Sequence, residues 1–173
     1  MDEQRTTVGI GEFVVSQNPG ALAIYGLGSC VALVFYDPAL GICGMAHVLL
    51  PGPRPKSDLK GDLPAKYADE ACQALGAALE AKGGVRRRWH AGIVGGARLF
   101  VSETPLEPGV GARNVEGALK AIEKAGVLLA WRETGGGAGR SVLFELPGGR
   151  LLVRALGEGW REARACHEAA SPA

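Results

Sequence analysis

GLGSCVALVFYDPALGICGMAHVLLP, residues 26–51, is the stretch that decides the fold. It contains two apolar, strand-like runs, residues 30–36 and 42–50, separated by Asp-Pro-Ala-Leu at 37–40. Asp at the first position and Pro at the second are typical of a type I turn, on which four-residue hairpin loops are usually built. The stretch therefore predicts an antiparallel β-hairpin in which Tyr36 pairs with Gly41.

This register brings a thiol and an imidazole together. Counting back along both strands sets Cys30 directly opposite His47, and residues opposite one another share a face with Cβ atoms about 5 Å apart. A slip of one residue would put them on opposite faces. A structural alternative stays open, because free cysteine is among the most buried residue types and a single histidine on an apolar strand is commonly a core group.

The residues just before Cys30 favour a catalytic interpretation. Gly26 and Gly28 allow a tight backbone turn with N–H groups directed outward. Backbone donors at Gly28 and Ser29 would then hold the oxyanion of a tetrahedral intermediate, and His47 would act as the base that generates the thiolate. The run is not a nucleotide-binding loop, because it lacks the further glycine of a dinucleotide fingerprint and the Gly-Lys-Ser/Thr of a phosphate loop.

Composition restricts the remaining classes of function. The chain has 173 residues, 47% hydrophobic and 21% charged, as expected of one globular domain. Its net charge of +1 gives no support for nucleic-acid or membrane binding. The charged N-terminus and the absence of a long apolar run predict no signal peptide and no membrane insertion. The four cysteines have no metal-ligand spacing, so we expect no metal or cofactor and a cytoplasmic protein with reduced thiols.

Strand and helix patterns predict a layered α/β domain. The first hairpin strand is apolar on both faces, which is typical of a strand covered on both sides. Helices are expected at 67–82 and around 115–122, and further strands at 8–16, 21–25, 89–94, 127–132, 141–146 and 150–155. We expect one α/β/α-like domain with mixed, largely antiparallel sheets over residues 1–156, followed by a frayed tail over 157–173.

Two further segments carry candidate binding residues. Gly95 and Gly96 follow the strand at 89–94, and Phe100 close by is expected in the core. Arg113 and Asn114 belong to the entry of the second helix, which would expose backbone donors at a helix N-terminus. We interpret Gly95, Gly96, Arg113 and Asn114 as substrate- or partner-binding residues.

Several motifs in order resemble the CheD family of chemoreceptor glutamine deamidases. They span about residues 8–154 and are GLGSC at 26–30, the Asp-Pro turn, MAHVLLP at 45–51, KYAD at 66–69, GGA at 95–97, GARN at 111–114 and the Thr134–Val142 run. The resemblance implies deamidation of glutamines on methyl-accepting chemotaxis proteins, with Cys30 as nucleophile and His47 as general base. It also implies binding to CheC, a phosphatase of CheY, and a fold like the deamidase core of cytotoxic necrotizing factor toxins.

One position departs from the family pattern. The family has a threonine that orients the histidine, six residues before the cysteine, and this chain has Ile24 there. The backbone carbonyl of Ile24 is the expected substitute. Two alternatives remain open on the sequence: a cysteine peptidase or transglutaminase using the same thioester chemistry, and a non-catalytic module that binds CheC or receptors.

Overall fold

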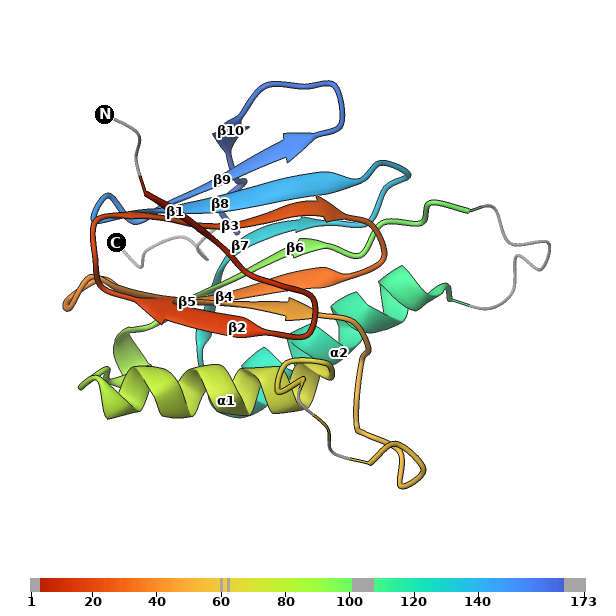
Figure 1. Cartoon of the computed structure of the whole chain (residues 1–173), viewed down its shortest axis with the longest axis horizontal. Coiled ribbons are helices and arrows are strands. Elements are labelled where there is room, and N and C mark those ends of the chain that lie inside the picture. The colour runs from red at the N-terminus through yellow and green to blue at the C-terminus, as the bar shows by residue number, and fades with distance from the viewer. Residues whose placement is uncertain (1–3, 60, 62, 101–107, 167–173) are drawn as a thin grey trace, which may run out of the picture.

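Two stacked β-sheets and a layer of two helices make up the computed structural model, which describes residues 4–59, 61, 63–100 and 108–166 (Figure 1). The outer sheet has the order β1 (Arg5–Thr7), β3 (Gly20–Leu27), β8 (Arg140–Leu146), β9 (Arg150–Ala155), β10 (Arg161–Glu162). The central sheet has the order β2 (Phe13–Ser16), β5 (Ile42–Val48), β4 (Val31–Asp37), β6 (His90–Gly95), β7 (Leu128–Thr134). Helices α1 (Ala68–Ala81) and α2 (Val110–Ala125) cover the free face of the central sheet.

The sheets are mixed and largely antiparallel, as predicted. Only the β1–β3 and β6–β7 pairs are parallel among the described strands. The α/β class is confirmed, but the layers run helix, sheet, sheet rather than α/β/α. The second apolar face of β4 is covered by the outer sheet, so no second helical layer is needed there.

β4 is buried on both faces, which is the feature that its sequence predicted. Val31, Leu33 and Phe35 contact the helices, whereas Ala32 and Val34 face the outer sheet. Side chains alternate along a strand, so an unbroken apolar run suits a strand with a layer on each side.

The hairpin forms, but its register differs from the predicted one by two residues. Asp37 pairs with Ile42 and Ala32 pairs with His47, so neither the Tyr36–Gly41 nor the Cys30–His47 pair exists. Gly41 has φ 63°, a left-handed conformation, and therefore belongs to the turn rather than to the strand. The Asp37 carboxylate accepts a hydrogen bond from the Ala39 N–H at 3.1 Å, which fixes Asp37 as the residue that precedes the loop.

Helix α1 packs on the central sheet through a stripe at helical spacing. The buried residues are Ala68, Ala71, Cys72, Leu75, Gly76 and Leu79. Cys72 lies in the core as expected, and burial raises the pKa of its thiol to about 11. Helix α2 begins at Val110, so the GARN segment forms its first turns. No helix in the described residues is long and apolar enough to cross a membrane.

Ordered structure extends beyond the expected end of the domain. The frayed tail predicted from residue 157 is wrong for the segment up to Cys166, because β10 pairs with β9 and Ala165 bridges Trp131 on β7. The buried Glu133 carboxylate accepts hydrogen bonds from Arg161 at 2.7 and 3.1 Å. Backbone pairing and a buried charge hold this segment in place. It has few large apolar side chains, so the sequence pattern did not indicate that it is ordered. Residues 167–173 lie outside the described residues.

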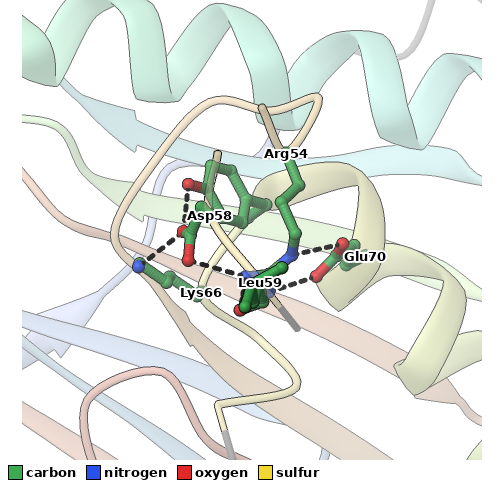
Figure 2. A network of polar contacts seen from close by, with 6 residues as sticks. Arg54, Asp58, Leu59, Lys66 and Glu70 are labelled. Carbon is green, nitrogen blue, oxygen red and sulfur yellow. Dashed lines mark hydrogen bonds and ion pairs between the residues drawn. The ribbon is translucent and has the colours of Figure 1, made fainter. Parts of the chain in front are cut away.

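A polar network fastens the loop between β5 and α1 (Figure 2). Arg54 donates two hydrogen bonds to Glu70, at 2.9 and 2.8 Å. Asp58 accepts from Lys66 at 2.7 Å and from the Tyr67 hydroxyl at 2.5 Å. The network ties the loop that follows the His47 strand to the start of α1.

Candidate active site

The backbone around Cys30 is held by the end of β6. The Gly28 carbonyl accepts a hydrogen bond from the Ala97 N–H at 2.8 Å, and the Cys30 carbonyl accepts one from the Gly96 N–H at 2.8 Å. Gly95 lies so close that a Cβ there would be 2.3 Å from the Cys30 carbonyl oxygen. The predicted glycines Gly95 and Gly96 therefore contact the backbone of the candidate nucleophile, which explains why side chains are missing there.

The opposite side of this turn presents backbone donors. Within the described residues, the N–H groups of Gly28, Ser29 and Cys30 make no hydrogen bond. The C=O and N–H of a trans peptide point in opposite directions, so the hydrogen-bonded carbonyls of Gly28 and Ser29 direct the N–H groups of Ser29 and Cys30 away from those partners. Such donors have the arrangement that an oxyanion needs.

His47 lies on the face of the central sheet that meets the outer sheet. It pairs with Ala32, two residues along from Cys30, so the two-residue register difference leaves Cys30 and His47 on the same face. Diagonal neighbours of this kind are about 7–8 Å apart at Cα, within reach of longer side chains. Cys30 packs against the cluster between the sheets and stays half-buried, while His47 is buried.

Burial makes both groups neutral at rest. It raises the pKa of the Cys30 thiol and lowers the pKa of His47. The backbone of Val8 acts on the His47 pKa in the opposite direction and only partly offsets burial. The Nδ1 atom of His47 is buried and has no hydrogen-bond partner of good geometry among the described residues. The site therefore holds a neutral thiol and an uncharged imidazole on one face of the central sheet, and the imidazole has unused hydrogen-bonding capacity.

The backbone of Val8 affects the His47 pKa and lies next to Ile24, the residue to which the sequence pointed. The Val8 N–H donates to the Ala23 carbonyl at 2.9 Å, which continues the β1–β3 pairing and sets Val8 beside residue 24. The Ile24 side chain is fully buried between the sheets. The assignment of the Ile24 carbonyl to His47 stays a prediction, and the backbone interaction of His47 with Val8 favours Val8 for that part.

A cavity of about 700 Å³ opens next to this turn. Ser29 and Gly96 line it together with Leu99 and Phe100, whereas neither Cys30 nor His47 does. Phe100 is 85% exposed, so the expectation that it belongs to the core is wrong. A mostly apolar cavity of this size beside backbone donors is a candidate binding site.

Comparisons with known proteins identify the family. The family model described as CheD chemotactic sensory transduction matches residues 49–155. The chain is 42% identical to the chemoreceptor glutamine deamidase CheD of Thermotoga maritima over 155 residues, which cover 90% of this chain and 94% of that protein. It is 34% identical to the probable chemoreceptor glutamine deamidase CheD of Caldanaerobacter subterraneus over 160 residues, 92% of this chain and 98% of that protein. The chain belongs to the CheD family.

Structural comparison adds little to this result. The Bacillus licheniformis hypothetical protein YfiH has a TM-score of 0.43 and 14% identity, over 72% of this chain and 56% of that one, which is too distant to inform the fold. The family match begins after both Cys30 and His47. In this CheD chain the roles of these two residues therefore rest on their geometry.

The two helix residues of the predicted binding set have different surroundings. Arg113 is exposed and lines a separate cavity of about 350 Å³ beside Pro51. Asn114 is fully buried and donates hydrogen bonds to the Ser29 carbonyl at 2.9 Å and the Leu49 carbonyl at 2.8 Å. Asn114 was expected on a surface that binds substrate or a partner. Its side chain is buried instead, so this part of the prediction is wrong.

Sequence reasoning missed both Val8 and the buried state of Asn114. Val8 interacts through its backbone, which no side chain in the sequence reveals. Asn114 had a usable signal, because it lies at helical spacing with Gly111, Val115 and Ala118 on the buried stripe of α2. A polar residue within such a stripe is buried and needs partners for its donors.

Proposed function

We propose that this chain is a chemoreceptor glutamine deamidase, which hydrolyses the side-chain amide of particular glutamines on methyl-accepting chemotaxis proteins to glutamate and ammonia. The observation that carries the proposal is the placement of Cys30, between outward backbone donors and the face that bears His47. Membership of the CheD family supports the choice of substrate, since the Thermotoga maritima relative is named a chemoreceptor glutamine deamidase.

The first half of the reaction forms a thioester. His47 takes the thiol proton as the Cys30 sulfur attacks the side-chain carbonyl carbon of the glutamine, and the oxygen becomes an oxyanion held by N–H groups of residues 28–30. The intermediate collapses by breaking the carbon–nitrogen bond. The proton held by His47 passes to the leaving nitrogen, so ammonia departs and the acyl group stays on Cys30.

The second half releases glutamate. His47, neutral again, takes a proton from a water molecule that attacks the thioester carbon. Collapse of this second intermediate expels the Cys30 thiolate, which recovers the proton from His47. Glutamine and water are thereby converted to glutamate and ammonia, and the protein returns to its starting state.

The pKa directions favour a proton transfer concerted with attack. With the thiol pKa raised and the imidazole pKa lowered, a preformed thiolate–imidazolium pair is disfavoured in the resting protein. A protein built this way has a sluggish free thiol and is activated when substrate arrives. The Cys30 thiol is therefore expected to be alkylated slowly at neutral pH.

Ammonia release from a receptor cytoplasmic fragment tests the proposal. Cys30→Ala should abolish release while the far-UV circular dichroism spectrum is unchanged. Cys166→Ala is the matched control, since that half-exposed cysteine lies in the C-terminal segment and its loss should leave the rate unchanged. Ammonia release that persists in Cys30→Ala would contradict the assignment.

Intact mass of the treated fragment separates deamidation from the other reactions. Deamidation exchanges an amide nitrogen for oxygen in an otherwise intact fragment, whereas a peptidase produces shorter fragments and a transglutaminase produces cross-linked ones. Wild-type protein that leaves the fragment unchanged but binds CheC would instead indicate the non-catalytic module.

The proposal also includes a cellular location and a second binding partner. We place the protein in the cytoplasm, which is supported by four free cysteines, Cys30, Cys43, Cys72 and Cys166. CheC is the proposed second partner, on the basis of the family resemblance. Co-elution of the chain with purified CheC in size-exclusion chromatography tests this part.

A further inference from the structure

Asn114 connects the two chain segments that carry the candidate catalytic residues. Its side-chain amide donates one hydrogen bond to the carbonyl of Ser29, which directly precedes Cys30, at 2.9 Å. The second goes to the carbonyl of Leu49, two residues after His47, at 2.8 Å. Both N–H bonds of one nitrogen are thus used, and each reaches a segment that leads into the site.

Two glycines on α2 allow the helix to come close enough for these contacts. A Cβ at Gly111 would lie 2.6 Å from the carbonyl oxygens of Gly96 and Ala97, and one at Gly117 would lie 2.3 Å from the Pro51 carbonyl oxygen. The helix backbone therefore touches the end of β6 on one side of Asn114 and the segment after β5 on the other. A short amide side chain placed between the two glycines spans the remaining gap.

The role of Asn114 differs from that of a helix cap. Gly109 is the N-cap of α2, so Asn114 lies within the helix and its side chain serves other elements. Its Oδ1 atom is buried and accepts no hydrogen bond from the described residues. The side chain is therefore committed to donation, which an isosteric aspartate could not perform because a carboxylate has no donor.

We propose that Asn114 is a positioning residue that fixes the Cys30 turn relative to the His47 end of β5. Without it, the carbonyls of Ser29 and Leu49 would lose their hydrogen-bond donor, and the two segments would be free to separate. The catalytic consequence rests on the proposed function, because it assumes that the thiol and the imidazole act together. The positional claim itself concerns only their relative placement.

The pH profile of Cys30 alkylation measures that placement without any deamidation. Iodoacetamide labelling of the Cys30 peptide, followed by mass spectrometry, would be compared in wild type, His47→Ala, Asn114→Ala and Asn114→Asp. A neutral imidazole can still donate a hydrogen bond to the Cys30 thiolate that forms at higher pH, so wild type should reach half-maximal labelling at a lower pH than His47→Ala. We expect both Asn114 variants to lose this difference and to coincide with His47→Ala. Ile122→Val, a buried change in the last part of α2, is the control: it should lower the melting temperature and keep the wild-type profile.

Steady-state kinetics supplies the second readout. In Asn114→Ala, kcat should fall about 100-fold, as for a misplacement of about 1 Å, with KM unchanged because Asn114 is buried away from substrate. An Asn114→Ala profile that superposes on that of wild type would overturn the inference. Wild-type and His47→Ala profiles that coincide would also overturn it, since no contact would then exist to be positioned.

Two outcomes separate this inference from the proposed function. Absence of ammonia release in wild type overturns the deamidase proposal, while the alkylation profiles still decide the role of Asn114. If neither Asn114 variant folds, hydrogen exchange of the Asn114 side-chain amide in the wild-type protein decides instead. Slow exchange of both hydrogens supports the positioning role of Asn114, and fast exchange of either one overturns it.

Discussion

The two ends of the β4–β5 hairpin solve opposite problems. At the turn end, the Asp37 carboxylate is fully buried and accepts hydrogen bonds from Arg88 at 2.8 and 3.3 Å and from the N–H groups of Val85 and Ala39 at 3.1 Å each. Burial alone would raise the pKa of Asp37, but these hydrogen bonds outweigh it and the pKa is lowered. Asp37 stays ionised because both of its carboxylate oxygens accept hydrogen bonds.

At the open end of the hairpin the titratable groups are neutral instead. Burial raises the pKa of Cys30 and lowers that of His47, and the Nδ1 atom of His47 has no partner of good geometry among the described residues. The same pair of strands therefore carries a fully paired, stabilising charge at its turn end and titratable groups without full hydrogen bonding at its open end. Titratable groups with a perturbed pKa and unsatisfied hydrogen-bonding capacity mark a candidate functional site.

Removal of the imidazole should have the largest effect on activity. His47→Ala should lower kcat for ammonia release by about 10³-fold, because one group serves as base and then as acid. His90→Ala is the matched control, since His90 lies on β6, which β4 separates from β5, and its ring packs against Trp131 on β7. Equal rates for His47→Ala and His90→Ala would remove the contrast between the two ends.

Removal of the carboxylate at the other end should affect stability instead. Asp37→Ala leaves Arg88 without its partner and should lower the free energy of unfolding by about 3 kcal/mol, the low end for a broken buried pair because Arg88 is one-third exposed. Urea unfolding measures this loss. Below the melting temperature the folded variant should retain kcat, and a variant that is stable but inactive would show that the turn takes part in catalysis.

The two ends should also respond to acid in different pH windows. His47 has a lowered pKa, so it is a neutral base at neutral pH, and kcat/KM should fall only as the pH drops below about 6.5. The lowered pKa of Asp37 means that its ion pair stabilises the fold above about pH 3.9 and is lost as the pH falls further. Parallel measurements of kcat/KM and of urea midpoints from about pH 8 to about pH 2 would separate the two events.

The buried neutral histidine also contributes to the pH dependence of stability, so the activity and stability effects overlap in part. Its folded-state pKa is below the unfolded value, so it too contributes stability that declines as the pH falls below about 6.5. His47→Ala is therefore the control, and its stability should be flat in the window where wild type loses activity. An activity limb at or above the ordinary histidine pKa would show that burial does not govern this site.

The β4–β5 hairpin shows which features of the fold the sequence could predict and which it could not. An apolar run on both faces of β4 sufficed to predict a strand covered by two layers, and side-chain period made the shared face of Cys30 and His47 survive a register error of two residues. The error itself came from Gly41, whose left-handed φ of 63° places it in the turn. The sequence did not reveal that a second sheet, rather than a second helical layer, covers β4.

The parts that escaped prediction share one physical cause. Val8 interacts with His47 through its backbone, and the segment up to Cys166 is held by strand pairing and by the buried carboxylate of Glu133. Such contacts depend on long-range topology rather than on local pattern. Asn114 is the intermediate case, since its position in the buried stripe of α2 was legible but its partners, Ser29 and Leu49, were not.

Restoration of the family threonine should have the smallest effect on activity. Ile24→Thr places a hydroxyl in the apolar cluster between the sheets, so the free energy of unfolding should fall by about 1–3 kcal/mol. Because the backbone of Val8 already acts on His47, we expect kcat to stay at the wild-type level. Ile24→Val removes one methyl group without adding a hydroxyl and should cost about 0.5–1.5 kcal/mol, which isolates the packing contribution. A rise in kcat in Ile24→Thr alone would show that the side chain at position 24, and not the Val8 backbone, governs the orientation of His47.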